Sequence, residues 1–180
     1  MELSFDQFQI RFMTLEDLPR ILELEKEIYP SPWPEESFYY EIEARESYVL
    51  EVKESRAIVG YLCGIRVFDE YMVNNIALKP DYQGYGLATL LISKVLMRQY
   101  RLGCQNCFLE VRVTNDKAIK LYDRIGFKTI NVRKNYYSNP VEDAFVMRCI
   151  LKEFIDKMSS TRLDEHGATN DSKTKEFRVL

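Results

Sequence analysis

The segment from Asn74 to Leu96, NNIALKPDYQGYGLATLLISKVL, joins a strand-like run to a helix-like run through two glycines. The apolar run that ends at Leu78 predicts a strand, and the apolar residues from 88 to 96 predict a helix because they recur at helical spacing. Gly84 and Gly86 have no side chains where the backbone turns, so the free N–H groups of the first helical turn, together with the helix dipole, offer a place for a phosphate group. The segment has neither the Lys-Ser/Thr pair of a P-loop nor the third glycine of a Rossmann fingerprint.

Strand-like and helix-like segments alternate on both sides of this turn. Thr14 followed by Asp17 resembles a capping box, Pro34 suits the first turn of a second helix, and Asn115 is a good N-cap for a short helix that Gly126 closes. The predicted strands are 7–13, 48–52, 57–68, 72–78, 107–113, 127–133 and 143–150, and the predicted helices begin at residues 14, 34, 86 and 115. This order predicts an α/β fold with a mixed, mostly antiparallel sheet of six to seven strands, flanked by helices, and a central parallel βα unit.

Length and charge limit the classes of protein that the chain can belong to. Its 180 residues predict one domain over residues 1–151 and a C-terminal tail, 152–180, that is helical or disordered. With 25 basic and 28 acidic residues the net charge is −3, which argues against binding to nucleic acid or to an anionic membrane. The chain has no run of 18 apolar residues and no signal-peptide pattern at its start, so we expect a cytoplasmic protein.

The counts of histidine and cysteine exclude further chemistry. The single histidine, His166, lies in the predicted tail. If that tail is outside the domain, a His-assisted serine or cysteine nucleophile and a metal site of several imidazoles are both excluded. Cys104 and Cys107 form a CxxC motif, but the other cysteines lack the paired spacing of a zinc site, and the motif does not open a helix as redox motifs do. We therefore expect buried, reduced thiols and no metal.

Several motifs in one order resemble a known family. Gln83, Gly86 and Ala88 fit the pattern Gln/Arg-x-x-Gly-x-Gly/Ala, and further matches are YPSPWPEESF (29–38), LEVRVTNDKAIKLYDRIGF (109–127), RKNYY (133–137) and EDAFVM (142–147). In these residues the chain resembles the GCN5-related N-acetyltransferase (GNAT) family, and in particular its ribosomal-protein-alanine N-acetyltransferase (RimI-type) branch. The resemblance covers Phe8 to about Leu151. It implies a GNAT-like fold and an enzyme that transfers an acetyl group from acetyl-CoA to an amine.

The resemblance also implies two catalytic residues. An α-ammonium group has a pKa of about 7.7 to 8.0 and must lose a proton before it attacks a thioester. The family pattern assigns the base to Glu110, acting directly or through water, and the acid that protonates the leaving thiolate to Tyr122. The residues taken alone leave other roles open, since Glu110 can pair with Arg112 or another cation and Tyr122 can be a packed helix residue. Glu27 or Glu36 is the fallback base.

The donor site implied by the resemblance surrounds the glycine turn. Backbone groups of the preceding strand should pair with the pantetheine arm as an added strand would, and the turn should hold the pyrophosphate. Asn115 should both cap its helix and contact the cofactor. The residues assigned to acetyl-CoA are Ile76, Ala77, Leu78, Gln83, Gly84, Tyr85, Gly86, Leu87, Ala88, Thr89 and Asn115.

The acceptor site is predicted from two distant segments. Trp33, Glu35 and Glu36 follow the first helix, while Tyr136 and Tyr137 are expected in the loop between the last two strands. An acidic and aromatic wall suits a cationic peptide N-terminus, although each of these residues is equally compatible with a surface or packing role.

The preferred function is acetyl transfer from acetyl-CoA to the α-amino group of a protein N-terminus, in particular the N-terminal alanine of a ribosomal protein. Cys107 is not expected to carry the acetyl group as a nucleophile, because the sequence offers no histidine to activate its thiol. The amine is therefore expected to attack acetyl-CoA directly in a ternary complex. The other acceptors left open are a lysine side chain, a polyamine or another small amine. A non-catalytic acetyl-CoA-binding module is the alternative from a different class. We expect a monomer that has a protein or peptide N-terminus as its partner.

Overall fold

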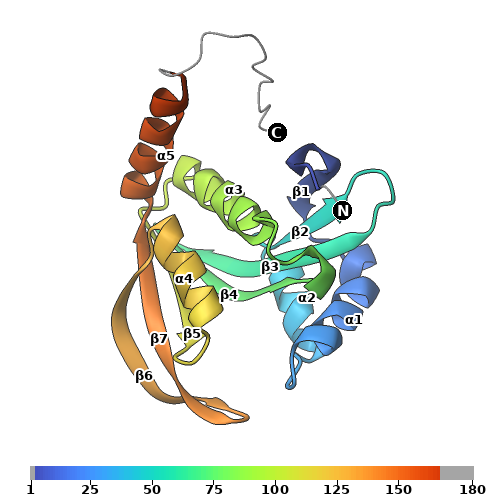
Figure 1. Cartoon of the computed structure of the whole chain (residues 1–180). Helices are drawn as coiled ribbons and strands as arrows, with labels where there is room; N and C mark the ends of the chain where they lie inside the picture. Colours follow the sequence, from blue (N-terminus) through green and yellow to red (C-terminus); the bar gives the residue numbers. More distant parts are fainter. Residues whose placement is uncertain (1–2, 167–180) are drawn as a thin grey trace.

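The computed structural model describes residues 3–166, with side chains described as far as Ser160. Its centre is a seven-stranded sheet with the order β1-β2-β3-β4-β5-β7-β6, in which only β4 and β5 are parallel (Figure 1). The strands are β1 (Phe8–Phe12), β2 (Tyr48–Val52), β3 (Ile58–Val67), β4 (Glu70–Leu78), β5 (Asn106–Arg112), β6 (Lys128–Ser138) and β7 (Val141–Ile150). The α-helices are α1 (Leu18–Ile28), α2 (Glu35–Glu43), α3 (Leu87–Arg101), α4 (Asp116–Ile125) and α5 (Leu151–His166). The predicted fold class is confirmed.

Helices cover both faces of the sheet and bury two apolar cores (Figure 1). α1 and α2 cover one face, where Ile21 and Phe38 are fully buried. α3, α4 and α5 cover the other face, where Leu91, Ile125 and Phe154 are buried. Because successive residues of a strand point to opposite faces, each central strand contributes side chains to both cores.

Two irregularities lie close together in β4. This strand pairs with β5 only over Glu70–Val73, against Asn106–Leu109, so the rest of β4 has one edge that β5 does not cover. The pairing of β3 with β4 shifts register between Cys63 and Gly64, which leaves Asn74 as an extra residue of β4. Such a bulge bends the strand that carries it. The bend therefore occurs where β4 parts from β5.

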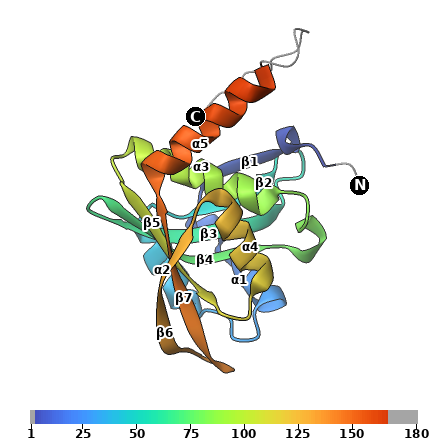
Figure 2. The same cartoon turned by 60° about the vertical axis from the view of Figure 1, so that its left-hand side comes forward.

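The last two strands form a longer hairpin than the sequence predicts (Figure 2). β6 continues through Tyr136 and Tyr137, so the prediction that these residues lie in a loop is wrong. The register shifts between Arg133 and Tyr137, and Asn135 has a φ of +52° and donates its N–H to Asp143. A polar bulge inside a paired strand has the composition of a loop, which explains the error.

The helix ends follow the local sequence signals. Thr14 and Asp17 form the predicted capping box, and a short 3₁₀ turn, η2 (Leu15–Asp17), leads into α1. Pro34 is the N-cap of α2 and not a residue of its first turn. α5 contains the helical start predicted for the tail, while residues 167–180, on which the predicted disorder falls, lie outside the described part of the chain. The domain boundary after Leu151 stays a prediction.

The four cysteines are free and buried, as predicted: Cys63, Cys104, Cys107 and Cys149. Burial raises the pKa of the Cys107 thiol well above its ordinary value, so this thiol is not ionised near neutral pH. Within residues 3–166, no helix combines the length and the apolar character needed to cross a bilayer.

Candidate active site

The glycine turn between β4 and α3 has the geometry that the sequence predicts. Gly84 and Gly86 have φ values of +86° and +81°, which L-residues with side chains rarely adopt. A Cβ placed on Gly84 would meet no atom within 4 Å, so the backbone is open on that side. Gly86 is the N-cap of α3, and no side chain caps this helix. The first N–H groups of α3, from Leu87 to Thr89, therefore lack helical partners and can bind an anion.

The free edge of β4 lies directly before this turn. Lys79 donates its N–H to Val59 on β3, and backbone groups alternate in direction along a strand. The backbone groups of Ile76 and Leu78 therefore point away from β3, toward the edge that β5 leaves uncovered. Ala77 faces β3 instead, where it pairs with Tyr61. Of the three residues predicted to offer backbone groups to a pantetheine arm, only Ile76 and Leu78 have the required direction.

Two side chains from outside β4 reach this edge. The Tyr29 hydroxyl donates to the carbonyl oxygen of Ile76 at 2.5 Å, and Gln83 Nε2 donates to that of Leu78 at 2.9 Å. Gln83 Oε1 also accepts a hydrogen bond from Lys117 Nζ at 2.8 Å, which links the turn to α4. Tyr29 is the first residue of the segment YPSPWPEESF but is not among the residues that the sequence predicts for the site.

The other residues assigned to the donor differ in exposure. Asn115 caps α4 by accepting the Ala118 N–H at 3.1 Å, as predicted, and is itself exposed. Leu87 is fully buried in the core, so only its backbone is available to a ligand. Half-buried or exposed residues of the turn are Gln83, Gly84, Tyr85, Gly86, Ala88 and Thr89.

Glu110 lies on β5 with its side chain directed away from the core that buries Leu109 and Val111. The Glu110 side chain is 17% exposed, and its Oε1 pairs with Arg133 NH1 at 2.8 Å. Arg112, the partner considered from sequence, pairs with Glu142 instead, at 2.9 Å. Among the side chains that the structure describes, as far as Ser160, none donates a hydrogen bond to Oε2 of Glu110, so one oxygen is available to a proton.

Tyr122 lies on α4 and is 6% exposed, with its ring centroid 5.7 Å from that of Phe127. Burial raises the pKa of its phenol well above the ordinary value, and Tyr137 and Cys107 add to this rise. The pKa of Tyr29 is raised in the same direction, mainly by burial and then by Tyr122 and Glu25. The phenols of Tyr122 on α4, Tyr137 on β6 and Tyr29 after α1 thus lie near one another, and all three are protonated at neutral pH.

The two tyrosines of β6 lie beside Glu110. Their ring centroids are 5.0 Å apart in an edge-to-face arrangement, and the guanidinium of Arg133 lies 4.7 Å above the Tyr136 ring. Arg112 lies 4.1 Å above the Tyr137 ring. Burial is the main cause that raises the pKa of Tyr137 to about 12, and Tyr136 contributes next. Arg133 therefore connects the carboxylate of β5 to the aromatic pair.

The segment between α1 and α2 is the second segment predicted for the acceptor site, and it contacts the β6–β7 turn. Trp33 is half-buried with its ring 5.6 Å from Phe38, and Asn139 Nδ2 in the β6–β7 turn donates to Ser31 Oγ at 3.0 Å. This hydrogen bond brings residues that are 108 positions apart into contact. Glu35 and Glu36 are exposed in the first turn of α2, and Glu35 accepts a hydrogen bond from the Tyr39 hydroxyl.

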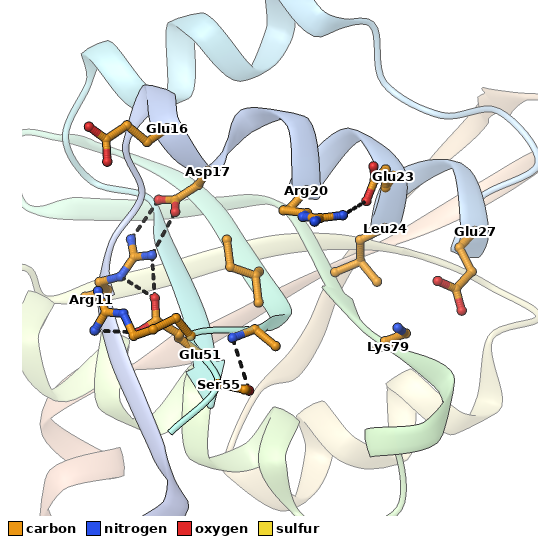
Figure 3. A pocket seen from close by; sticks show the side chains of 13 residues that line it. Arg11, Glu16, Asp17, Arg20, Glu23, Leu24, Glu27, Glu51, Ser55 and Lys79 are labelled. Atoms are coloured by element: carbon orange, nitrogen blue, oxygen red, sulfur yellow. Dashed lines mark hydrogen bonds and ion pairs between the residues drawn. The ribbon is translucent and has the colours of Figure 1, made fainter. Parts of the chain in front are cut away.

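A separate polar pocket of about 510 Å³ lies between α1 and the start of the sheet (Figure 3). It contains the ion pairs of Arg11 with Asp17 and Glu51. None of the residues predicted for the donor, the acceptor or the two catalytic roles lines it. Glu27, one of the two fallback bases, does line this pocket.

The comparison with known families agrees with this geometry. Residues 18–127 match the acetyltransferase (GNAT) family. The chain belongs to this family. The predicted resemblance and the predicted enzyme class, an acyl-CoA-dependent N-acetyltransferase, are both confirmed.

Individual relatives support the RimI-type branch. The [ribosomal protein bS18]-alanine N-acetyltransferase of Haemophilus influenzae is 37% identical over 75% of this chain and 93% of its own length. The crystal structure of the ribosomal-protein-S18-alanine N-acetyltransferase from Escherichia coli has a TM-score of 0.74 and 30% identity, over 80% of this chain and 94% of that protein. NAA60 of Arabidopsis thaliana, solved with acetyl-CoA, shares the fold with a TM-score of 0.72 at 17% identity, over 79% of this chain and 99% of that one.

Proposed function

We propose that this GNAT enzyme transfers the acetyl group of acetyl-CoA to the α-amino group of a protein N-terminus, and that its acceptor is the N-terminal alanine of a ribosomal protein. The similarity to the Haemophilus influenzae enzyme, which extends over nearly the whole of that protein, is the observation that carries this proposal. The aromatic walls beside Glu110 add physical support, because aromatic faces and a carboxylate suit an ammonium group.

Donor recognition is assigned to the turn and to the free edge of β4. The N–H groups from Leu87 to Thr89 would bind the pyrophosphate, with the Lys117 ammonium nearby to favour negative charge. Ile76 and Leu78 would offer their backbone groups to the pantetheine amides. The Ile76 and Leu78 carbonyl oxygens each already accept one hydrogen bond, from the Tyr29 hydroxyl and from Gln83 Nε2, and each has a second lone pair for a pantetheine amide.

The proton transfers are assigned to two side chains. Oε2 of Glu110 would accept the proton of the acceptor ammonium, while Arg133 holds Oε1 and so orients the carboxylate. The freed amine nitrogen forms a bond to the thioester carbonyl carbon as the carbon–sulfur bond breaks, and it releases its second proton to solvent, from which Tyr122 regains the proton that it gives to sulfur. Tyr122 would donate its proton toward the departing sulfur, and its raised pKa keeps the hydroxyl protonated until that step.

A thiol-release assay with acetyl-CoA tests the acceptor. The acceptors are peptides that differ only in their first residue, a peptide with a blocked N-terminus and one free lysine, and spermidine. We expect turnover with a free N-terminal alanine and at most background release with the blocked peptide. Turnover on the blocked peptide or on spermidine alone would establish the lysine or polyamine alternative. An enzyme that binds acetyl-CoA but releases no thiol with any acceptor would match the non-catalytic module.

A further inference from the structure

Glu25, in the last part of α1, is a buried carboxylate whose partners are all neutral donors. Its side chain is 1% exposed and accepts hydrogen bonds from the Tyr61 hydroxyl, from the backbone N–H of Trp33 at 2.9 Å and from Asn75 Nδ2 at 3.2 Å. Among residues 3–160, whose side chains the structure describes, no lysine or arginine forms an ion pair with it. A buried charge without a cation is costly unless donors surround it, so these contacts are required for its burial.

Two of the three donors come from opposite sides of the proposed active site. Trp33 belongs to the wall between α1 and α2, whereas Asn75 lies on β4 one residue beyond the bulge and one residue before Ile76. Tyr61 lies on β3, and its hydroxyl donates to Oε2 of the Glu25 carboxylate. One side chain therefore connects the acceptor wall to the strand whose free edge is assigned to the donor.

We propose that Glu25 is a positioning residue, which holds the Trp33 segment at a set distance from β4 so that the acceptor amine meets the acetyl group. This inference rests on the proposed function, because it gives that segment the role of an acceptor wall. Glu25 touches neither substrate. It acts through the Trp33 backbone and through Asn75, and the hydrogen bonds it accepts matter more than its charge.

Glu41 on α2 provides a matched control. It is also a buried glutamate, 8% exposed, and it also accepts a hydrogen bond from an asparagine of β4, Asn74, at 2.7 Å. Its other donor is the Ser47 hydroxyl at 2.8 Å. In the part of the chain with described side chains, residues 3–160, Glu41 too has no ion pair. Unlike Glu25, Glu41 accepts its hydrogen bonds from Ser47 and Asn74 and not from the Trp33 segment, so its loss should affect stability alone.

The experiment compares Glu25→Met with Glu41→Met in the full-length enzyme. Methionine fills the space but accepts none of the hydrogen bonds. We expect both variants to lose thermal stability, while the KM for the acceptor peptide rises about tenfold in Glu25→Met and less than about twofold in Glu41→Met. The KM for acetyl-CoA should stay within about twofold in both. Trp33 is the only tryptophan, so acrylamide quenching of its fluorescence should increase in Glu25→Met alone.

Two conservative variants complete the test. Glu25→Gln should restore the acceptor KM, because its carbonyl oxygen can accept from Trp33 and Asn75 while its amide donates to the Tyr61 oxygen. Glu25→Asp keeps the charge but shortens the side chain, so its acceptor KM should rise. It replaces Glu25→Met as the deciding variant if the methionine variant does not fold.

Equal acceptor KM values in the Glu25 and Glu41 variants would overturn the proposal, as would an unchanged acceptor KM with altered Trp33 quenching. A raised acceptor KM in Glu25→Gln equal to that of Glu25→Met would contradict the hydrogen-bond role. If the wild-type enzyme acetylates no N-terminal peptide, the proposed function is wrong. Trp33 quenching then still decides whether Glu25 holds the wall.

Discussion

The donor half and the acceptor half of the candidate site are built in different ways. The donor half is nearly one continuous segment, from Ile76 through the glycine turn to Thr89. The acceptor half combines the segment after α1 with strand β6, and the β6–β7 turn contacts that segment through the Ser31–Asn139 hydrogen bond. A local turn can be recognised from its own residues, whereas a wall assembled from distant segments depends on the whole sheet. The two halves should therefore respond to different changes.

The largest effect is expected at Glu110, on the strand between the halves. Glu110→Gln should lower kcat about 100-fold at saturating substrates, because the amide cannot accept the proton of the acceptor amine. Steady-state thiol release measures this. Glu142→Gln is the control, since Glu142 is also a partly buried carboxylate paired with an arginine, Arg112. A kcat in Glu110→Gln within about twofold of wild type would show that Glu110 is not the base.

The donor half alone should respond to Gly84→Ala. Gly84 has a φ of +86°, and alanine there costs roughly 1–2 kcal/mol and would shift the backbone that faces the phosphates. We expect the KM for acetyl-CoA to rise about tenfold while the acceptor KM changes less than about twofold. Both constants come from the same assay.

Gly103 supplies the control for this donor variant. Its φ is +93°, and a Cβ placed there also meets no atom within 4 Å, but it follows α3 at the opposite end from the turn. Gly103→Ala should therefore lower stability by a similar amount and leave both KM values unchanged. If Gly103→Ala raised the KM for acetyl-CoA as much as Gly84→Ala, the effect would be one of general strain.

The acceptor half alone should respond to Asn139→Ala, which removes the hydrogen bond to Ser31. An exposed hydrogen bond contributes about 0.5–1.5 kcal/mol, so the acceptor KM should rise about threefold and the KM for acetyl-CoA should not change. Peptide titrations at saturating acetyl-CoA measure the effect. Ser31→Ala should reproduce it, and the double variant should show no further increase; additive effects would mean that the two residues act separately.

The smallest expected effect concerns the start of α1, which carries the acceptor wall. Burial of Asp17 works against its ionisation, but hydrogen bonds from Arg11 and Thr14 outweigh this and hold the pKa of the carboxyl below its ordinary value. A lowered folded-state pKa stabilises the protein above the unfolded value of about 3.9, and that stability is lost as the pH falls through the folded-state pKa. Melting temperatures from pH 5 to pH 2.5 should therefore fall less steeply in Asp17→Asn than in wild type. Parallel curves would contradict this assignment.

The local backbone features of the candidate donor half are predictable from sequence, whereas the contacts that form the candidate acceptor half are not. Glycines at positive φ, an uncapped helix start and the N-cap Asn115 are all features of neighbouring residues, and each lies where it was expected. Tyr29 was missed, because the hydrogen bond that places it at the site joins residues 47 positions apart. Ala77 was assigned to the open edge because sequence alone does not tell which backbone groups face β3.

The sequence by itself determined the strand–turn–helix unit and the fold class, because glycine conformation, helix caps and apolar periodicity act over a few residues. The family came from the resemblance of several short motifs to those of known acetyltransferases. Only the tertiary structure decided which cation holds Glu110, that Tyr136 and Tyr137 lie in a strand, and that Glu25 joins the acceptor wall to β4. These features depend on strand order, register and bulges. They form only when the sheet packs against the helices on its two faces, since side chains distant in sequence come into contact only then.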